Sequence, residues 1–231
     1  YSGGHELRLI VLPGLDGTGA LSEPLCARLS LSHDVENVRY PGELFQYEDL
    51  ARWLESGLGP GDFAIIAESF SGPLAIRLAA TQPAGLKALI LVASFARSPR
   101  RVPAFAAAGL YLLPLRSRLL IRLTRRLLVG KWGAQDFPET WTKIISTVPR
   151  PTLVGRLREV LRVNVTGQLS VIQCPRLLIV ADRDRLVPVA NTHDFSRHGW
   201  ATEKVEGPHF LNLTRGEDVA ERIEVFLEHE V

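Results

Sequence analysis

The fold of this chain is constrained most by a series of short apolar runs separated by segments of helical periodicity. The runs show little alternation between apolar and polar residues, so each would be buried on both sides. Strands of this kind belong to parallel sheets whose crossover helices cover both faces. The runs that predict strands are 7–12, 35–40, 63–67, 86–93, 175–181 and 201–205, and those that predict helices are 20–29, 47–58, 73–81, 189–197 and 217–228. We therefore expect an α/β fold with a mostly parallel sheet.

Residues 97–168 interrupt this alternation and differ in charge from the rest. They contain only helical or irregular patterns. Residues 97–162 hold 14 Lys and Arg against three acids, a net charge of +11, although the whole chain has a net charge of only +2. We expect residues 1–96 and 169–231 to form the α/β core and residues 97–168 to form a helical cap, or lid.

Composition narrows the class of protein and its compartment. With 46% apolar and 23% charged residues, the chain is neither disordered nor fibrous in type. Cys26 and Cys174 give no disulfide framework and no metal-ligand spacing, which favours a reducing compartment. The chain has no apolar run of membrane-spanning length, no signal-peptide pattern at its start and no methionine at all. We expect a cytoplasmic protein whose N-terminus has been trimmed or processed.

The segment 65–75 carries the strongest chemical signal, because a predicted strand runs directly into a predicted helix with Ser69 at the junction. Ala67 and Ser71, two positions to either side, are small enough for a sharp turn. Such a turn raises the serine hydroxyl above the sheet, near helix N–H groups that favour negative charge. Ser69 could instead simply cap the helix, and Ser71 is a competing candidate. We favour Ser69 because it takes the apex of the turn.

This turn resembles the nucleophile elbow of the α/β-hydrolase family, with A-E-S-F-S in place of G-x-S-x-G. The family's chain order of serine, acid and histidine is also matched. Asp184 lies in a D-R-D-R-L-V-P loop after a predicted strand, and His209 lies in a Gly-Pro turn after the last one. Asp182 is the alternative acid, although it is more typical of a turn residue. The resemblance implies a Ser69–His209–Asp184 catalytic triad.

Residues 12–19, L-P-G-L-D-G-T-G, resemble the family's oxyanion loop with Pro13 in place of histidine. The resemblance implies that the backbone N–H groups of Leu15 and Phe70 stabilise the oxyanion. A phosphate-binding turn is the rival interpretation, but the glycine order is the reverse of G-x-G-x-x-G. Asp16 either contacts substrate or stabilises the glycine turn.

The cap sequence allows two interpretations. Arg118, Arg122 and Arg125 would share one helical face, and leucines at 119, 120, 123 and 127 would share another. A basic amphipathic helix can lie on an anionic membrane, or its apolar face can cover an acyl pocket. We favour the lid, because the family places its cap here, and expect Phe105, Leu110 and Leu113 to line the pocket. Charge alone would permit nucleic-acid binding, which no recognised motif supports.

The resemblance implies a serine hydrolase that cleaves carboxylic esters of short or medium acyl chain through an acyl-enzyme, with no metal or cofactor. A thioesterase or acyltransferase would use the same triad, and a non-catalytic small-molecule binding protein of this fold is the alternative from another class. The expected partner is a small-molecule ester, with neither nucleic acid nor an obligatory membrane. Peripheral membrane contact through the cap and the oligomeric state stay open.

Overall fold

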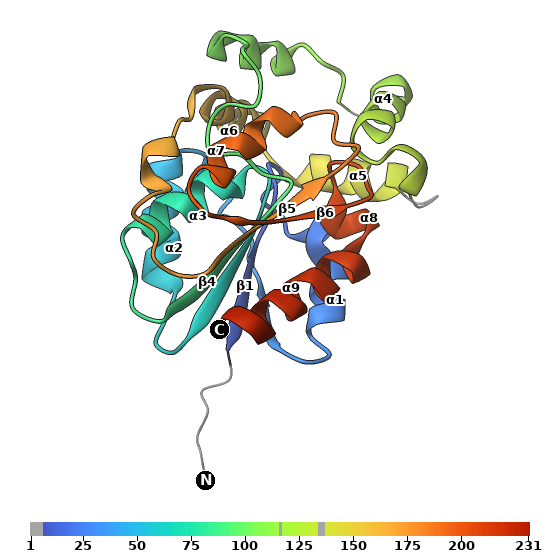
Figure 1. Cartoon of the computed structure of the whole chain (residues 1–231). Helices are drawn as coiled ribbons and strands as arrows, with labels where there is room; N and C mark the ends of the chain where they lie inside the picture. Colours follow the sequence, from blue (N-terminus) through green and yellow to red (C-terminus); the bar gives the residue numbers. More distant parts are fainter. Residues whose placement is uncertain (1–6, 116, 134–136) are drawn as a thin grey trace.

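The computed structural model describes residues 7–115, 117–133 and 137–231. Six strands form one sheet in the order β2-β1-β3-β4-β5-β6, and every neighbouring pair is parallel (Figure 1). The strands are β1 (Arg8–Leu12), β2 (Asp34–Asn37), β3 (Phe63–Glu68), β4 (Leu86–Val92), β5 (Arg176–Ala181) and β6 (Ala201–Val205). The predicted α/β class and parallel sheet are confirmed.

Helices cover both faces of the sheet because alternate strand residues bury apolar side chains on opposite sides. Ile65 of β3 belongs to a buried cluster with side chains of α2 (Tyr47–Gly57) and α3 (Ser71–Ala80). Its neighbour Ile66 belongs to a second cluster with side chains of α1 (Glu23–Leu29) and α9 (Gly216–Glu230). Smaller elements complete the core region, namely η1 (Ala20–Ser22), η5 (Val189–Asn191), α7 (Thr192–Ser196) and α8 (Leu211–Thr214).

Strand β2 is shorter than the predicted run 35–40. It lies at the sheet edge and pairs with β1 alone, up to Asn37 opposite Val11. The Val38 N–H still donates to the carbonyl of Val11, but the Tyr40 N–H donates to the carbonyl of Gly17 instead. The chain therefore leaves the ladder to support the loop that follows β1.

Between β4 and β5 the described residues form several helices joined by irregular segments, and they contain no strand. The helices of this stretch are η2 (Ala104–Tyr111), α4 (Arg118–Leu128), η3 (Gly130–Trp132), α5 (Phe137–Thr147), α6 (Arg150–Arg162) and η4 (Thr166–Gln168). A bridge between Arg97 and Asn164 brings the two ends of the stretch together. In Figure 1, η2 and α4 lie beyond the carboxyl ends of the strands. The chain thus leaves and rejoins the core at neighbouring points, as an inserted cap would.

The parallel register brings the loops after the strands to one edge of the sheet. Leu12 at the end of β1 pairs with Ala67 of β3, and Ala181 at the end of β5 pairs with Val205 of β6. The segments that begin at Pro13, Ser69, Asp182 and Glu206 therefore meet above this edge. Among the described residues, no helix is both long and apolar enough to cross a bilayer.

Candidate active site

Ser69 occupies the apex of the turn between β3 and α3 in a left-handed backbone conformation, with φ at +47°. Non-glycine residues rarely adopt this region, and it persists only where neighbouring contacts enforce it. Here the Ser69 N–H donates to the carbonyl of Val92 at 2.9 Å, and the Ser94 hydroxyl donates to the carbonyl of Ser69 at 2.7 Å. A Cβ at Gly72 would lie 1.8 Å from the Ser94 oxygen, so only glycine fits there. The turn is therefore tightly specified.

His209 connects Ser69 to Asp184. Its Nε2 lies 2.8 Å from the Ser69 Oγ, and its Nδ1 lies 2.7 Å from an Asp184 Oδ. The second Asp184 oxygen accepts the N–H groups of Leu186 and Val187. The side chains of His209 and Asp184 are each only 3% exposed. With the proton on Nδ1 donated to Asp184, Nε2 is free to accept the serine proton.

The two alternative residues have other partners. The Ser71 hydroxyl is fully buried, donates to the carbonyl of Pro13 and hydrogen-bonds the Tyr40 hydroxyl. One Asp182 oxygen accepts the Gly207 N–H at 3.1 Å, which holds the turn before His209. Both residues thus support the loops around Ser69 and His209, and Asp184 rather than Asp182 contacts the histidine.

The predicted oxyanion donors lie beside Ser69. Leu15 and Phe70 both line the cavity that contains the serine and the histidine. Within the described part of the chain, neither backbone N–H donates to a protein acceptor. Two unengaged amides in residues that line one cavity are compatible with the predicted donation to an oxyanion. Asp16 lines the same cavity while its carboxylate accepts the Thr18 N–H and hydroxyl, so it also holds the turn.

Arg156 of α6 is a buried cation that the sequence analysis did not single out. Its guanidinium donates to four backbone carbonyls, those of Leu15, Asp16, Pro41 and Leu44, at 2.7 to 3.3 Å. It also lies over the rings of Tyr40 and Phe70, 5.5 and 6.0 Å from their centroids. The side chain is 1% exposed and stands against Gly17, where a Cβ would lie 2.2 Å from it. Arg156 therefore fastens α6 to the loop that carries Leu15.

A predominantly apolar cavity of about 370 Å³ lies over Ser69. Of the predicted pocket residues, Asp16, Leu110 and Leu113 line it. Phe105 does not, and its placement in the pocket was wrong: the side chain is 76% exposed. In the 3₁₀ geometry of η2, residues three apart share a face. Ala107, which is buried, shares a face with Leu110, and Phe105 points elsewhere.

The faces of α4 also differ from the prediction. Leu120, Thr124 and Leu128 line the cavity, whereas Leu119, Leu123 and Leu127 are exposed. Arg125 is partly buried, and Arg126 takes its place among the exposed arginines. The helix therefore turns the stripe containing Leu120 inward. A second leucine stripe, which the lid hypothesis assigned to the pocket, faces outward.

Glu68 is a buried carboxyl directly before the serine. It is 1% exposed and lines the cavity. The Ser22 hydroxyl donates to one oxygen at 3.4 Å, and the other oxygen has no hydrogen-bond partner. Burial, reinforced by the nearby charge of Asp16, raises the pKa of Glu68 to about 8. Glu68 therefore carries a proton at neutral pH.

Comparison with known proteins places this geometry in a known fold. A bromoperoxidase from Bacillus anthracis aligns with 97% of this chain and 93% of its own, at a TM-score of 0.82 and 15% identity. An enol-lactonase from Burkholderia xenovorans aligns with 99% and 94%, at a TM-score of 0.80 and 16% identity. The chain has the α/β-hydrolase fold. The resemblance seen in the sequence is thereby confirmed at the level of fold.

A thioesterase and a polyketide synthase are also similar to this chain. The type II thioesterase BorB from the borrelidin biosynthetic cluster aligns with 96% of this chain and 92% of its own, at a TM-score of 0.69 and 22% identity. A polyketide synthase, ThaQ, from Burkholderia thailandensis is 30% identical over 119 residues. That match covers 46% of this chain and only 6% of the synthase. No model of a protein family matches the chain.

Within the described residues, no group of three His, Cys, Asp or Glu side chains could hold a metal ion.

Replacing Arg156 should destabilise the protein more than replacing a neighbouring exposed arginine. Arg156→Lys keeps the charge but cannot supply the planar set of donors, so buried carbonyls lose partners. We expect the free energy of unfolding, measured in urea, to fall by at least about 2 kcal/mol. The matched control Arg158→Lys, exposed on the same helix, should change it by less than about 0.5 kcal/mol. Equal effects would contradict the role of Arg156.

The raised pKa of Glu68 predicts a pH-dependent stability. In the unfolded chain this carboxyl ionises near its ordinary pKa of 4.5, but in the folded protein it stays protonated up to about pH 8. The folded state therefore binds more protons in this window, and its stability falls as pH rises, by at most about 1.4 kcal/mol per pH unit. Glu68→Gln should remove this loss, as seen in urea unfolding at pH 5, 6.5 and 8. The exposed control Glu55→Gln should lose stability with rising pH as the wild type does. If the free energy of unfolding of Glu68→Gln fell with pH as steeply as that of the wild type, the prediction would be refuted.

Proposed function

We propose that this protein is a serine hydrolase that cleaves carboxylic esters through an acyl-enzyme intermediate. The observation that carries the proposal is the hydrogen-bonded series from Ser69 through His209 to Asp184, with its serine at an apolar cavity. A serine hydroxyl becomes a nucleophile near neutral pH when a base accepts its proton and a carboxylate orients that base. The 2.8 and 2.7 Å separations are within the range for both contacts.

In the proposed mechanism, the Ser69 oxygen attacks the ester carbonyl as His209 Nε2 takes its proton. The carbonyl oxygen becomes an oxyanion, to which the Leu15 and Phe70 N–H groups donate. Asp184 stabilises the positive charge that His209 acquires and holds its ring in place. His209 then protonates the departing alcohol, which leaves the acyl group on Ser69. A water molecule, deprotonated by His209, releases the acid and restores the hydroxyl.

The lining of the cavity suits an acyl group, which we propose is the part of the substrate that the protein recognises. Leucines from η2, the following loop and α4 line it, with Trp141 of α5 and Leu153 of α6. An apolar wall of this kind binds methylenes by the hydrophobic effect. This favours a short or medium acyl chain held by residues 97–168, which we propose act as the cap.

Thioester cleavage is the second candidate. The local match to a polyketide synthase and the likeness to a type II thioesterase favour it. The same triad would form the same acyl-enzyme and expel a thiolate in place of an alcohol. Acyl transfer would differ only in the group that accepts the acyl chain from Ser69. Rates on p-nitrophenyl esters beside acyl-coenzyme A thioesters of equal chain length would distinguish these reactions.

Ser69→Ala should abolish ester hydrolysis while the protein stays folded. Loss of the nucleophile usually lowers kcat by about 10⁴ to 10⁶. Ser71→Ala is the matched control, and it should keep activity within about tenfold because its hydroxyl serves the loop. Activity is measured on p-nitrophenyl acetate, and folding by circular dichroism. The reverse ranking would transfer the role to Ser71, and an inactive wild type would favour a non-catalytic binding protein.

Bulk added at the cavity wall should shift chain-length preference without disabling the triad. Each methylene excluded from an apolar pocket costs about 0.8 kcal/mol, or roughly fourfold in kcat/KM. Leu110→Trp or Leu113→Trp should therefore lower the rate on longer p-nitrophenyl esters progressively, while the acetate rate stays within about tenfold. Phe105→Trp, on the exposed side of η2, is the control and should leave the profile unchanged. If both cavity variants kept the chain-length preference of the wild type, residues 97–168 would not determine which acyl chain is selected.

A further inference from the structure

The outer face of α4 carries two parallel stripes of opposite chemistry. Arg118, Arg122 and Arg126 follow one another at intervals of four residues, and all three are exposed. A second series, also at intervals of four residues, consists of Leu119, Leu123 and Leu127, whose exposed fractions are 78%, 48% and 36%. Residues four apart share a face of a helix, so the arginine stripe and the leucine stripe run side by side. Large aliphatic side chains exposed in a row mark a surface that a partner covers.

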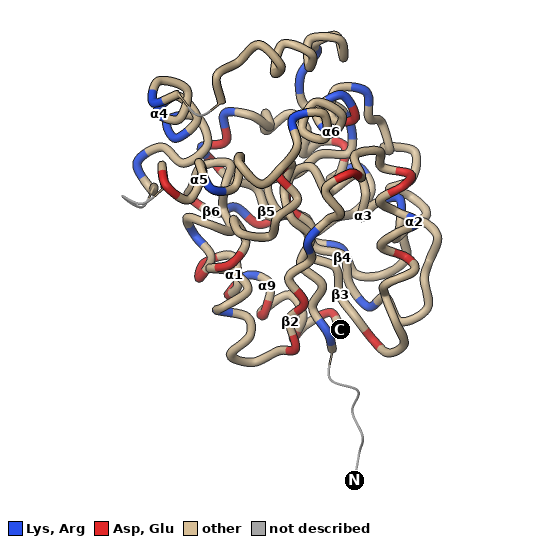
Figure 2. The backbone as a smooth tube through the Cα atoms, turned by 180° about the vertical axis from the view of Figure 1, so that it is seen from behind, with Lys and Arg blue, Asp and Glu red and all other residues tan. Residues whose placement is uncertain are grey.

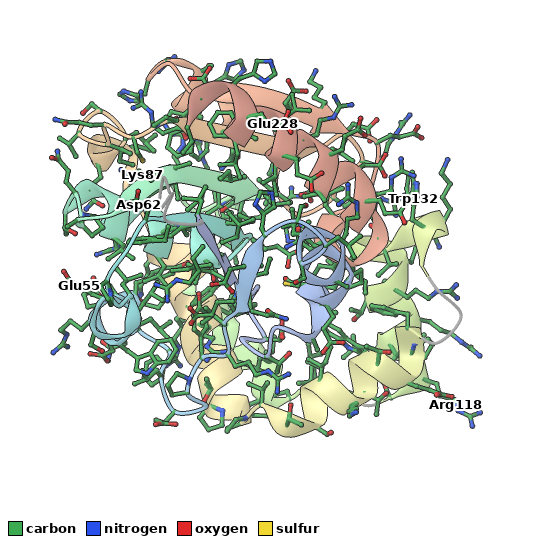
Figure 3. All side chains as sticks on the ribbon, turned by 90° about the horizontal axis from the view of Figure 1, so that it is seen from below. Glu55, Asp62, Lys87, Arg118, Trp132 and Glu228 are labelled. Carbon is green, nitrogen blue, oxygen red and sulfur yellow. The ribbon has the colours of Figure 1, made fainter. Side chains whose placement is uncertain are left out.

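The arginine stripe has no acidic partner within the described residues. None of its three members takes part in an ion pair there. The helix itself contains no Asp or Glu, and its tube in Figure 2 is blue at the arginines and tan elsewhere. Arg118 projects away from the body of the molecule in Figure 3. The stripe is thus a set of cations available to an anionic partner.

Further apolar side chains project from the neighbouring part of the same segment. Phe105 is 76% exposed and Leu112 is 87% exposed. The η2 and α4 elements both lie at the end of the molecule beyond the strand ends, in the front view and in the view from behind (Figures 1 and 2). These side chains protrude into solvent, and a partner that covers them must accept large apolar groups.

We propose that this surface, the outer face of α4 with Phe105 and Leu112, docks onto a lipid bilayer that contains anionic headgroups. A bilayer accepts protruding leucines at its interface and places phosphates beside the arginines. The distribution of charge agrees with this occupant. Residues 97–162 have a net charge of +11 while the whole chain has only +2, so the rest of the molecule is acidic and would be repelled from the same surface.

The docking surface adjoins the cavity. Leu113 lines the cavity and is also 41% exposed, and the inward stripe of α4 that begins at Leu120 forms part of the same wall. An acyl chain leaving the bilayer would therefore meet apolar groups continuously from the surface to Ser69. This step rests on the proposed function, whereas docking itself does not.

The test measures sedimentation of the full chain with vesicles of phosphatidylcholine alone or with 30 mol% phosphatidylglycerol. We expect binding to the anionic vesicles only, weakened by 0.5 M NaCl. Arg118→Gln, Arg122→Gln and Arg126→Gln together should weaken binding on the order of a hundredfold, since each cation contributes about fivefold. A control with equal loss of charge replaces the exposed Arg52, Arg197 and Lys204 by Gln, and should bind within about threefold of wild type.

The leucine stripe is tested in the same assay. Leu119→Gln should weaken binding at least about tenfold, also at high salt. Leu31→Gln, at an equally exposed leucine of 78%, is its control and should have no effect. Absence of binding, equal binding to neutral vesicles, or equal behaviour of test and control variants would overturn the proposal. So would sedimentation velocity showing a dimer that Leu119→Gln dissociates, because a second copy would then cover the surface.

Hydrolysis of soluble p-nitrophenyl acetate keeps the two proposals separable. An inactive protein that binds anionic vesicles would refute the proposed function and leave docking supported. An active protein that ignores vesicles would refute docking alone. Circular dichroism of each variant establishes that it is folded, so a loss of binding reports on the surface.

Discussion

The left-handed backbone of Ser69 is the constraint on which the site depends. A serine in this conformation raises its hydroxyl above the sheet edge, and the fold must enforce it because the residue disfavours it. The carbonyl of Val92, the Ser94 hydroxyl and the absence of a side chain at Gly72 do so together. All three come from β4, the loop after it and α3. The parallel sheet therefore determines the position of the candidate nucleophile as well as its neighbours.

Arg156 extends this dependence to α6. Its guanidinium contacts the loops after β1 and β2 at once, so α6 is fastened to the segment that contains Leu15, one of the two predicted oxyanion donors. Phe210, next to His209, packs in a buried cluster with Phe137 and Ile144 of α5. Residues 97–168 thus contact both the loop that contains a predicted oxyanion donor and the segment that contains the predicted base. Residues 97–168, held in this way, would act as a fixed wall of the cavity.

The sequence predicted those features of the structure that depend on a local pattern of residues. The apolar runs located all six strands, and the four central strands β1, β3, β4 and β5 are buried as their lack of alternation indicated, whereas the edge strands β2 and β6 are largely exposed. Chain order and loop context selected Ser69, Asp184 and His209, which the structure brings into hydrogen-bond contact. Their catalytic roles stay predictions.

Long-range packing decided what the sequence missed. Nothing local separates Arg156 from the exposed Arg158, since only the meeting of α6 with the loops after β1 and β2 buries the former. Helical periodicity indicated that α4 is amphipathic but could not say which leucine stripe faces the cavity. Phe105 was misplaced because the pattern gave no sign of 3₁₀ geometry in η2. In each case the answer depends on a contact between segments far apart in the chain.

The central claim is that His209 activates Ser69 as a nucleophile. Covalent labelling with a fluorophosphonate, located by peptide mass spectrometry, tests it most directly. We expect one label per chain, on Ser69, with labelling lost in Ser69→Ala and strongly slowed in His209→Ala. A folded wild-type protein that takes no label, or takes it on Ser71, would show that His209 does not activate Ser69.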